Sequence, residues 1–155
     1  MYPSLSAERA LALETLLEKI KKTSAKMATS DGVRGEKRTR KNAREKISFA
    51  LLFGLEELQE QGRSLEVEGK PFDLATAPED DRVDLCNRIA VRIETGLFVS
   101  ADERVDKNYA EKFRRLATNL QHPENTDLRT AVLCQDVDAR SMANMSAEEL
   151  APKVL

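Results

Sequence analysis

Apolar residues along most of the chain recur three or four positions apart, the spacing that places side chains on one face of an α-helix. This spacing predicts helices over residues 6–27, 37–61, 79–98, 107–121 and 125–134, and a last short helix from Ser146. Only residues 65–68 are compatible with a short extended piece. The pattern therefore predicts an all-α fold, in which the three longer helices from residue 37 onwards form a three-helix bundle. Short C-terminal helices close this bundle, and the pattern allows a further helix at the N-terminus.

Residues typical of helix ends flank these segments. Gly62 is a typical C-terminal stop, and Pro123 ends the helix that precedes it. Two pairs have the spacing of a capping box, and one residue is a typical N-cap: Thr76 with Glu79, Ser146 with Glu149, and Asn125.

The chain divides at a segment rich in Gly, Ser and Asp, residues 28–36, which has no periodicity and reads as a flexible break. We therefore expect an N-terminal helix and flexible linker over residues 1–36 and a helical domain over residues 37–155. The short apolar stripe of the first helix is compatible with packing on the domain or with a place in a linker. The chain stops directly after a helical pattern, which indicates a piece of a longer protein.

The net charge of −2 conceals an asymmetry between the two ends of the chain. Residues 1–48 hold twelve Lys and Arg against six Asp and Glu, a balance of +6, and the remainder therefore carries −8. Such a polarised chain can turn one end toward a charged partner. There is no signal peptide and no apolar run near 18 residues, so we expect no membrane association.

The positive end is concentrated in seven cations within 13 residues: Arg34, Lys37, Arg38, Arg40, Lys41, Arg44 and Lys46. One interpretation is contact with nucleic acid, for which the first six are the candidates, or a nuclear localisation signal. The alternative is the solvated start of a helix. Because no aromatic residue is interleaved, base stacking is not supported, and phosphate contact alone is non-specific.

Catalytic and metal-binding patterns are not evident in the sequence. The single histidine, His122, lies before Pro123 at a helix end, where a capping or surface role is expected. Cys86 and Cys134 are 48 positions apart in apolar helical contexts, which is typical of reduced core thiols. The carboxylate pairs at 56–57 and 80–81 occupy surface-like positions. We predict no catalytic residue, no metal site, no cofactor and no enzymatic activity.

Three ordered motifs in the last third of the chain resemble those of the central domain of the transcription elongation factor TFIIS. The resemblance covers residues 37–155 and has departures from the family. Gln121-His122 replaces a Lys-Asp pair, Gln135 replaces a Gly, the Pro before the last short helix is absent near Asp138-Ala139, and the loop between the first two bundle helices is long. The matching residues are Tyr109, Lys112, Phe113, Arg114, Asn119 and Leu120 in the first motif; Asn125, Leu128, Arg129, Val132 and Leu133 in the second; and Met145, Ser146, Glu148, Glu149, Leu150 and Ala151 in the third.

The resemblance implies a nuclear, monomeric module that binds the jaw region of the largest subunit of RNA polymerase II during transcription elongation. In the family the polymerase-facing surface lies on the third bundle helix and the loop before it. Arg114 is the strongest candidate, because a forked guanidinium on a rigid helix suits a carboxylate partner. The full set of polymerase-binding candidates is Arg104, Lys107, Lys112, Arg114 and Arg115.

Residues 100–103, Ser-Ala-Asp-Glu, resemble the catalytic tip of the TFIIS zinc ribbon, which assists RNA cleavage. That ribbon needs four cysteines in two close pairs to hold zinc, and this chain has two distant ones. We therefore interpret Asp102 and Glu103 as acids near a helix start. Two kinds of parent protein remain open: TFIIS itself with the ribbon cut off, and chromatin regulators that join a PHD finger, a TFIIS-like domain and a SPOC domain. We favour the second.

Overall fold

Helices account for nearly all the regular structure in residues 7–26 and 34–152, the part of the chain that the computed structural model describes. The all-α prediction is confirmed. None of the helices within these two ranges combines the length and apolarity that crossing a membrane requires. The elements are α1 (Ala7–Lys26), α2 (Arg34–Glu60), β1 (Leu65–Val67), β2 (Lys70–Phe72), α3 (Glu79–Ser100), α4 (Lys107–Gln121), α5 (Thr126–Leu133), the 3₁₀ helix η1 (Ala139–Asn144) and α6 (Ala147–Leu150).

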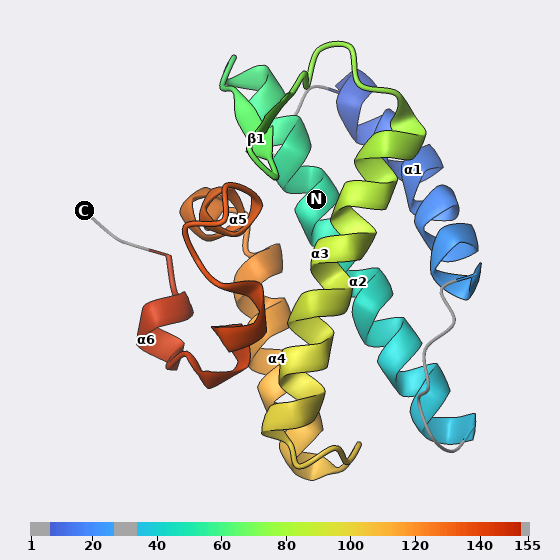
Figure 1. Cartoon of the computed structure of the whole chain (residues 1–155), viewed down its shortest axis with the longest axis vertical. Coiled ribbons are helices and arrows are strands. Elements are labelled where there is room, and N and C mark those ends of the chain that lie inside the picture. The colour runs from blue at the N-terminus through green and yellow to red at the C-terminus, as the bar shows by residue number, and fades with distance from the viewer. Residues whose placement is uncertain (1–6, 27–33, 153–155) are drawn as a thin grey trace.

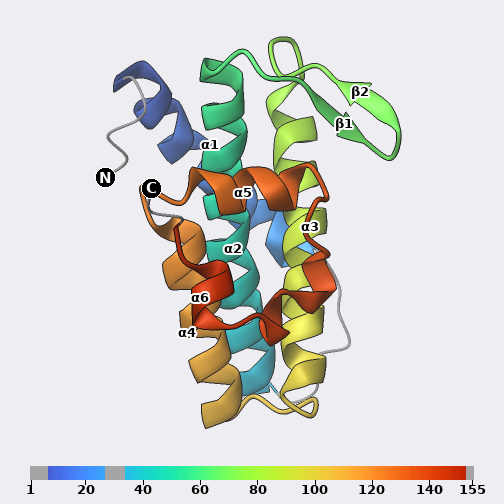
Figure 2. The same cartoon turned by 90° about the vertical axis from the view of Figure 1, so that its left-hand side faces the viewer.

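The three longer helices from residue 34 onwards, α2, α3 and α4, form the predicted bundle, and α3 is antiparallel to the other two (Figures 1 and 2). Their apolar stripes meet in one core, whose fully buried members include Leu51, Ile93 and Leu116. Helix α5 crosses the bundle, while η1 and α6 lie beside α4 (Figure 2). Burial of these stripes is the main stabilising contribution that the fold offers.

Helix α1 packs along α2 and α3 and adds a fourth helix to the bundle (Figure 1). Leu13, Leu16 and Ile20 are almost completely buried in the common core. At the surface, Lys19 Nζ lies 2.8 Å from Glu79 Oε2 and 3.2 Å from Asp80 Oδ1. Residues 28–33 of the predicted flexible break lie outside the described part of the chain, and residues 34–36, also predicted in the break, are helical. Helix α2 begins at Arg34, three residues earlier than predicted.

A short antiparallel hairpin, β1–β2, connects α2 to α3 and confirms the predicted extended piece over residues 65–67. Glu68 lies in the turn, with a φ of 52°. Leu65 pairs with Phe72, and its buried side chain joins the core. Gly62 ends α2 as predicted. Its φ of 68° is in the left-handed region that glycine adopts without strain, and the next amide, that of Arg63, donates to the Leu58 carbonyl at 3.0 Å.

The helix starts follow the predictions only in part. The capping box of Ser146 and Glu149 is present at α6. The one predicted from Thr76 is wrong, because α3 begins after Pro78 and has no side-chain cap. Asn125 occupies the N-cap position of α5 as predicted, but its side chain makes no capping hydrogen bond. Its Nδ2 donates instead to the carbonyls of Asn119 and Leu150, at 2.9 and 2.8 Å. Asn125 thus joins the end of α4 to α6.

Two glycines allow the C-terminal elements to approach the bundle helices closely. A Cβ at Gly96 of α3 would lie 2.1 Å from the carbonyl oxygen of Arg140, so η1 lies directly against this helix. A Cβ at Gly54 of α2 would lie 2.9 Å from Leu133 Cδ1. A side chain at position 96 would meet the backbone of η1 and displace it, whereas at position 54 the Leu133 side chain would have to shift.

Candidate functional site

Two of the six cations predicted to contact nucleic acid are buried between the first turns of α2, the end of α3 and the start of α4. The Glu94 carboxylate accepts from Arg40 Nε at 2.7 Å, from Arg40 Nη2 at 2.9 Å and from Arg44 Nη1 at 3.2 Å. It also accepts from the Tyr109 hydroxyl at 3.0 Å. The Arg40 guanidinium in addition lies over the Phe98 ring, 3.7 Å from its centroid. The prediction that Arg40 and Arg44 contact nucleic acid at the surface is therefore wrong, because both arginines neutralise a buried carboxylate.

The other predicted nucleic-acid candidates of that segment, Arg34 apart, lie at or near the surface of α2. Lys37 and Arg38 are exposed, and Lys41 is half-buried with its Nζ 3.8 Å from Glu45 Oε1. The side chain of Arg34 lies outside the described part of the chain. The predicted basic patch is thus divided between the surface and the interior of α2.

A second buried pair corrects the prediction that residues 56 and 57 are surface carboxylates. Glu57 accepts from Arg129 Nε at 2.6 Å and from its Nη2 at 3.0 Å, and Arg129 is completely buried. Glu56 accepts from Arg82 Nη1 at 3.1 Å. The pair at 80–81 is exposed, as expected. Arg129 further donates to the carbonyls of Leu120, His122 and Pro123, which closes the end of α4.

The sequence does contain a signal for these buried charges. Glu94 lies four residues after Ala90 and three before Leu97, so it belongs to the apolar stripe of α3. Arg129 likewise lies three residues before Val132. A charged residue at a stripe position is rarely buried unless it is paired, so each of them predicts a partner on a neighbouring helix.

The candidate polymerase-binding residues lie on α4 and the turn before it. Asp106 starts the helix by accepting from the Tyr109 amide at 3.2 Å. Lys107 and Arg114 are exposed and are seven residues apart, hence within about 20° of each other around the helix axis. Arg104 is exposed in the preceding turn. The structure thus places three of the five cations at the surface, two of them on one face of a capped helix.

The other two candidates lie on a different side of α4. Lys112 is half-buried, and its Nζ donates to the carbonyl and to the hydroxyl of Ser100, both at 3.2 Å. Arg115 is also half-buried. Lys112 therefore joins α4 to the end of α3 and is less free than Arg114 to meet a partner.

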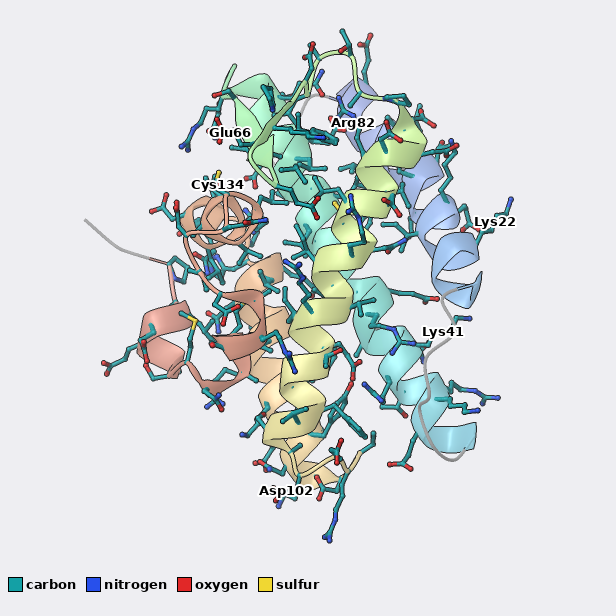
Figure 3. The ribbon with its side chains drawn as sticks, viewed as in Figure 1. Lys22, Lys41, Glu66, Arg82, Asp102 and Cys134 are labelled. Atoms are coloured by element: carbon teal, nitrogen blue, oxygen red, sulfur yellow. The ribbon has the colours of Figure 1, made fainter. Side chains whose placement is uncertain are left out.

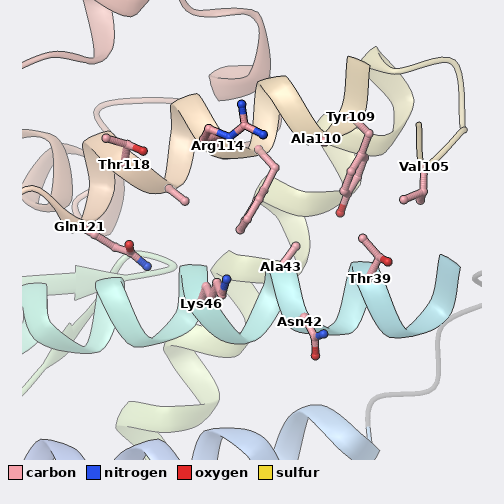
Figure 4. A pocket seen from close by; sticks show the side chains of 12 residues that line it. Thr39, Asn42, Ala43, Lys46, Val105, Tyr109, Ala110, Arg114, Thr118 and Gln121 are labelled. Carbon is pink, nitrogen blue, oxygen red and sulfur yellow. The ribbon is translucent and has the colours of Figure 1, made fainter. Parts of the chain in front are cut away.

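A groove of about 440 Å³ runs between α2 and α4, and Arg114 is on one of its walls (Figure 4). Lys46 stands on the opposite wall, on α2 (Figure 4). Phe113, which the sequence places in the core stripe, is only half-buried and lines this groove. The lining consists of Thr39, Asn42, Ala43, Lys46, Val105, Tyr109, Ala110, Phe113, Arg114, Ala117, Thr118 and Gln121.

The acids of the Ser-Ala-Asp-Glu segment are exposed in the turn between α3 and α4, where Figure 3 shows Asp102 at the end of the bundle. Both have positive φ, 59° at Asp102 and 56° at Glu103. The acid that caps α4 is Asp106 instead. Across residues 7–26 and 34–152, no group of three or more His, Cys, Asp or Glu side chains is arranged to hold a metal ion.

The remaining candidate side chains have structural surroundings. His122 follows the last residue of α4, and its Nδ1 accepts from the Glu124 amide at 3.1 Å, in agreement with the predicted capping role. Cys86 is fully buried, which raises the pKa of its thiol and keeps it protonated. Burial also raises the pKa of the Cys134 thiol.

Comparison with known proteins gives concordant results. The model of the transcription factor S-II (TFIIS) central domain matches residues 35–155. A segment of 68 residues is 32% identical to transcription factor BYE1 of Yarrowia lipolytica, and this match covers 42% of the chain and 8% of that protein. The solution structure of TFIIS domain II of human PHD finger protein 3 superposes with a TM-score of 0.56 and 27% identity, over 83% of this chain and 88% of that one. The chain belongs to the TFIIS central-domain family.

Proposed function

We propose that this domain is the RNA polymerase II-binding module of a nuclear regulator of transcription elongation or chromatin. It docks on the jaw region of the largest polymerase subunit through the outward basic face of α4. Membership of the TFIIS central-domain family supports this proposal, as do the two relatives, one named as a transcription factor and the other as a PHD finger protein. The matched segment is a small part of the first relative, so the module is one part of such a regulator.

The exposed pair Lys107 and Arg114 carries the proposal. Both side chains project from one face of a capped helix, whose backbone is formed before binding. Lys107 Nζ lies 4.0 Å from Glu111 Oε1 in an exposed pair, so Arg114 is the cation of this face that forms no ion pair among the described residues. Arg114 offers the forked donor that binds a carboxylate through two hydrogen bonds. Arg104 extends the positive surface into the preceding turn. Lys112 and Arg115 contribute at the margin, because both are half-buried.

The domain acts by binding alone under this proposal. The exposed acids of residues 102–103 lie in a turn of this domain and are not held by a zinc ribbon. The PHD finger in the name of the solved relative favours a parent of the PHD and SPOC type over TFIIS itself. In such a parent, the domain would bring the neighbouring modules to the elongating polymerase.

Binding of purified RNA polymerase II to the immobilised 155-residue chain tests the proposal. Replacement Arg114→Glu reverses one of the two exposed charges that carry the basic face and is expected to weaken binding at least tenfold, which corresponds to about 1.4 kcal/mol. Replacement Arg92→Glu reverses an exposed charge on α3 and serves as the matched control. Equal binding of wild type and Arg114→Glu would remove α4 as the docking face.

A further inference from the structure

The groove between α2 and α4 has an apolar floor that no element of the described chain covers. Ala43 of α2 and Ala117 of α4 line it but are themselves buried, so exposed Ala110 and the half-buried ring of Phe113 supply its accessible apolar surface. The opposite flank of α4, in contrast, is covered by η1 and α6 (Figure 2). Because the side chains of the three lining alanines are small, another apolar segment can approach the backbones of α2 and α4 closely.

The walls of the groove are positively charged. Lys46 of α2 and Arg114 of α4 are both exposed and stand on opposite sides of it (Figure 4). Among the described residues that line it, none is an Asp or a Glu. Lys46 Nζ also lies 5.9 Å from the centroid of the Phe113 ring, at the edge of cation–π range. An occupant with carboxylates on both of its sides would complement this charge.

The length of the groove fits a short helix. On α4 it extends from Tyr109 to Gln121, a rise of about 18 Å at 1.5 Å per residue. A helical segment of about twelve residues has the same length. A helix laid in the furrow between two others buries an apolar stripe at i, i+3, i+4 and i+7, which is an established mode of peptide recognition.

We propose that this groove binds a short amphipathic helix of a partner protein, with an apolar stripe on one side and Asp and Glu residues flanking it. The site is additional to the polymerase-binding face and shares only Arg114 with it. Nucleic acid fits less well, because Arg40 and Arg44 are buried against Glu94 and only two aromatic side chains, Phe113 and the buried Tyr109, line the groove. Phosphate tracking needs a row of exposed cations, and base stacking needs accessible rings.

Fluorescence anisotropy with a labelled twelve-residue peptide tests this proposal. The peptide carries Leu or Phe at positions 1, 4, 5, 8 and 12 and Asp or Glu elsewhere, and the control peptide replaces every acid with Lys. The 155-residue chain is expected to bind the acidic peptide at least tenfold more tightly than the basic one. The amide resonances of the isotope-labelled chain that shift on titration are expected to cluster at Ala43, Ala110 and Ala117.

Variants separate this site from polymerase docking. Lys46→Glu reverses a charge on the wall of the groove, and Ala110→Trp fills its floor from an exposed position; each is expected to weaken peptide binding at least tenfold. Lys107→Glu alters the α4 face outside the groove lining and is expected to weaken polymerase binding while leaving peptide binding unchanged. Failure of one proposal therefore leaves the other intact.

Three results would overturn the groove proposal. The first is equal affinity for the two peptides, or no binding of the acidic one. The second is a set of shifted resonances on wild-type chain that lies away from the groove, which needs no variant to be folded. The third is binding of a twelve-nucleotide single-stranded RNA in the groove without binding of the acidic peptide, which would make it a nucleic-acid surface.

Discussion

Two basic segments of this chain, one on α2 and one on α4, look alike in sequence and differ in what their cations do. Arg40 and Arg44 of α2 are buried and share the Glu94 carboxylate. Lys107 and Arg114 of α4 are exposed on one face of their helix. The density of positive charge alone therefore does not reveal a binding surface.

The difference follows from where each cation lies relative to the apolar stripe of its own helix. Arg44 precedes Ile47 by three residues and Arg40 precedes Ala43 by three, so both point toward the core. Water does not solvate these buried guanidinium groups, and the Glu94 carboxylate of α3 supplies the counter-charge instead. Arg114 lies between stripe positions and has no such partner among the described contacts, so it remains available to another molecule.

Of the replacements in the buried cluster, Glu94→Gln is expected to lower the free energy of unfolding most. The amide keeps the shape of the side chain but leaves two buried arginines without a counter-charge, which costs about 3–5 kcal/mol of unfolding free energy. Urea unfolding followed by circular dichroism measures the loss. The control, Glu66→Gln on the exposed side of β1, is expected to leave the unfolding midpoint unchanged. A Glu94→Gln domain as stable as wild type would show that the cluster is dispensable.

Replacement Arg129→Lys is expected to cost about 2 kcal/mol, because an ammonium cannot bind both Glu57 oxygens and the carbonyls at the end of α4 at once. The same urea experiment measures this, with Arg92→Lys on the surface as control. An Arg129→Lys domain with the same unfolding midpoint as wild type would mean that any buried cation suffices at this position.

Replacement Tyr109→Phe removes one hydrogen bond to Glu94 and is expected to cost about 1 kcal/mol at neutral pH. Burial, reinforced by the Glu94 charge, raises the pKa of Tyr109 above its ordinary value of about 10. The unfolded chain therefore loses this proton first, and the stabilisation is complete below pH 10 and declines above it. The stability difference between wild type and variant should shrink from pH 9 to pH 11. A stability difference that stays constant from pH 9 to pH 11 would mean that the pKa of Tyr109 is not raised in the folded domain.

Replacements Lys107→Gln and Arg114→Gln are expected to have the smallest effect on stability, since both side chains are exposed and neither belongs to a buried pair. Thermal unfolding should give midpoints within experimental error of wild type. A marked loss at either position would show that the basic face of α4 is structural, like that of α2.

The regular spacing of apolar residues was sufficient to predict the bundle. The bounds predicted for α4, 107–121, agree with the structure, because Pro123 and a continuous stripe define that helix locally. The Ser146 capping box is equally local. The Thr76 capping box was wrong, and Asn125 is the N-cap residue of α5 without a capping side-chain bond. A capping pattern specifies which groups can bond, whereas the surrounding chain decides which bonds form.

The site could be predicted only in part, because its character depends on contacts between distant segments. Glu94 lies 54 residues from Arg40 in sequence, and Glu57 lies 72 residues from Arg129. The groove likewise requires Lys46 and Arg114 to meet across two helices (Figure 4). A sequence pattern identifies the face of one helix, but it does not say which other face lies opposite.

The central claim is that exposed cations of α4, and not those of α2, bind RNA polymerase II. The most direct measurement compares the affinity of purified polymerase for two charge-reversed chains, Lys107→Glu/Arg114→Glu on α4 and Lys37→Glu/Arg38→Glu on α2. All four side chains are exposed, so folding should be retained in both. We predict at least a hundredfold loss of affinity for the α4 variant and less than a threefold loss for the α2 variant. Equal losses, or a larger loss for the α2 variant, would contradict the account.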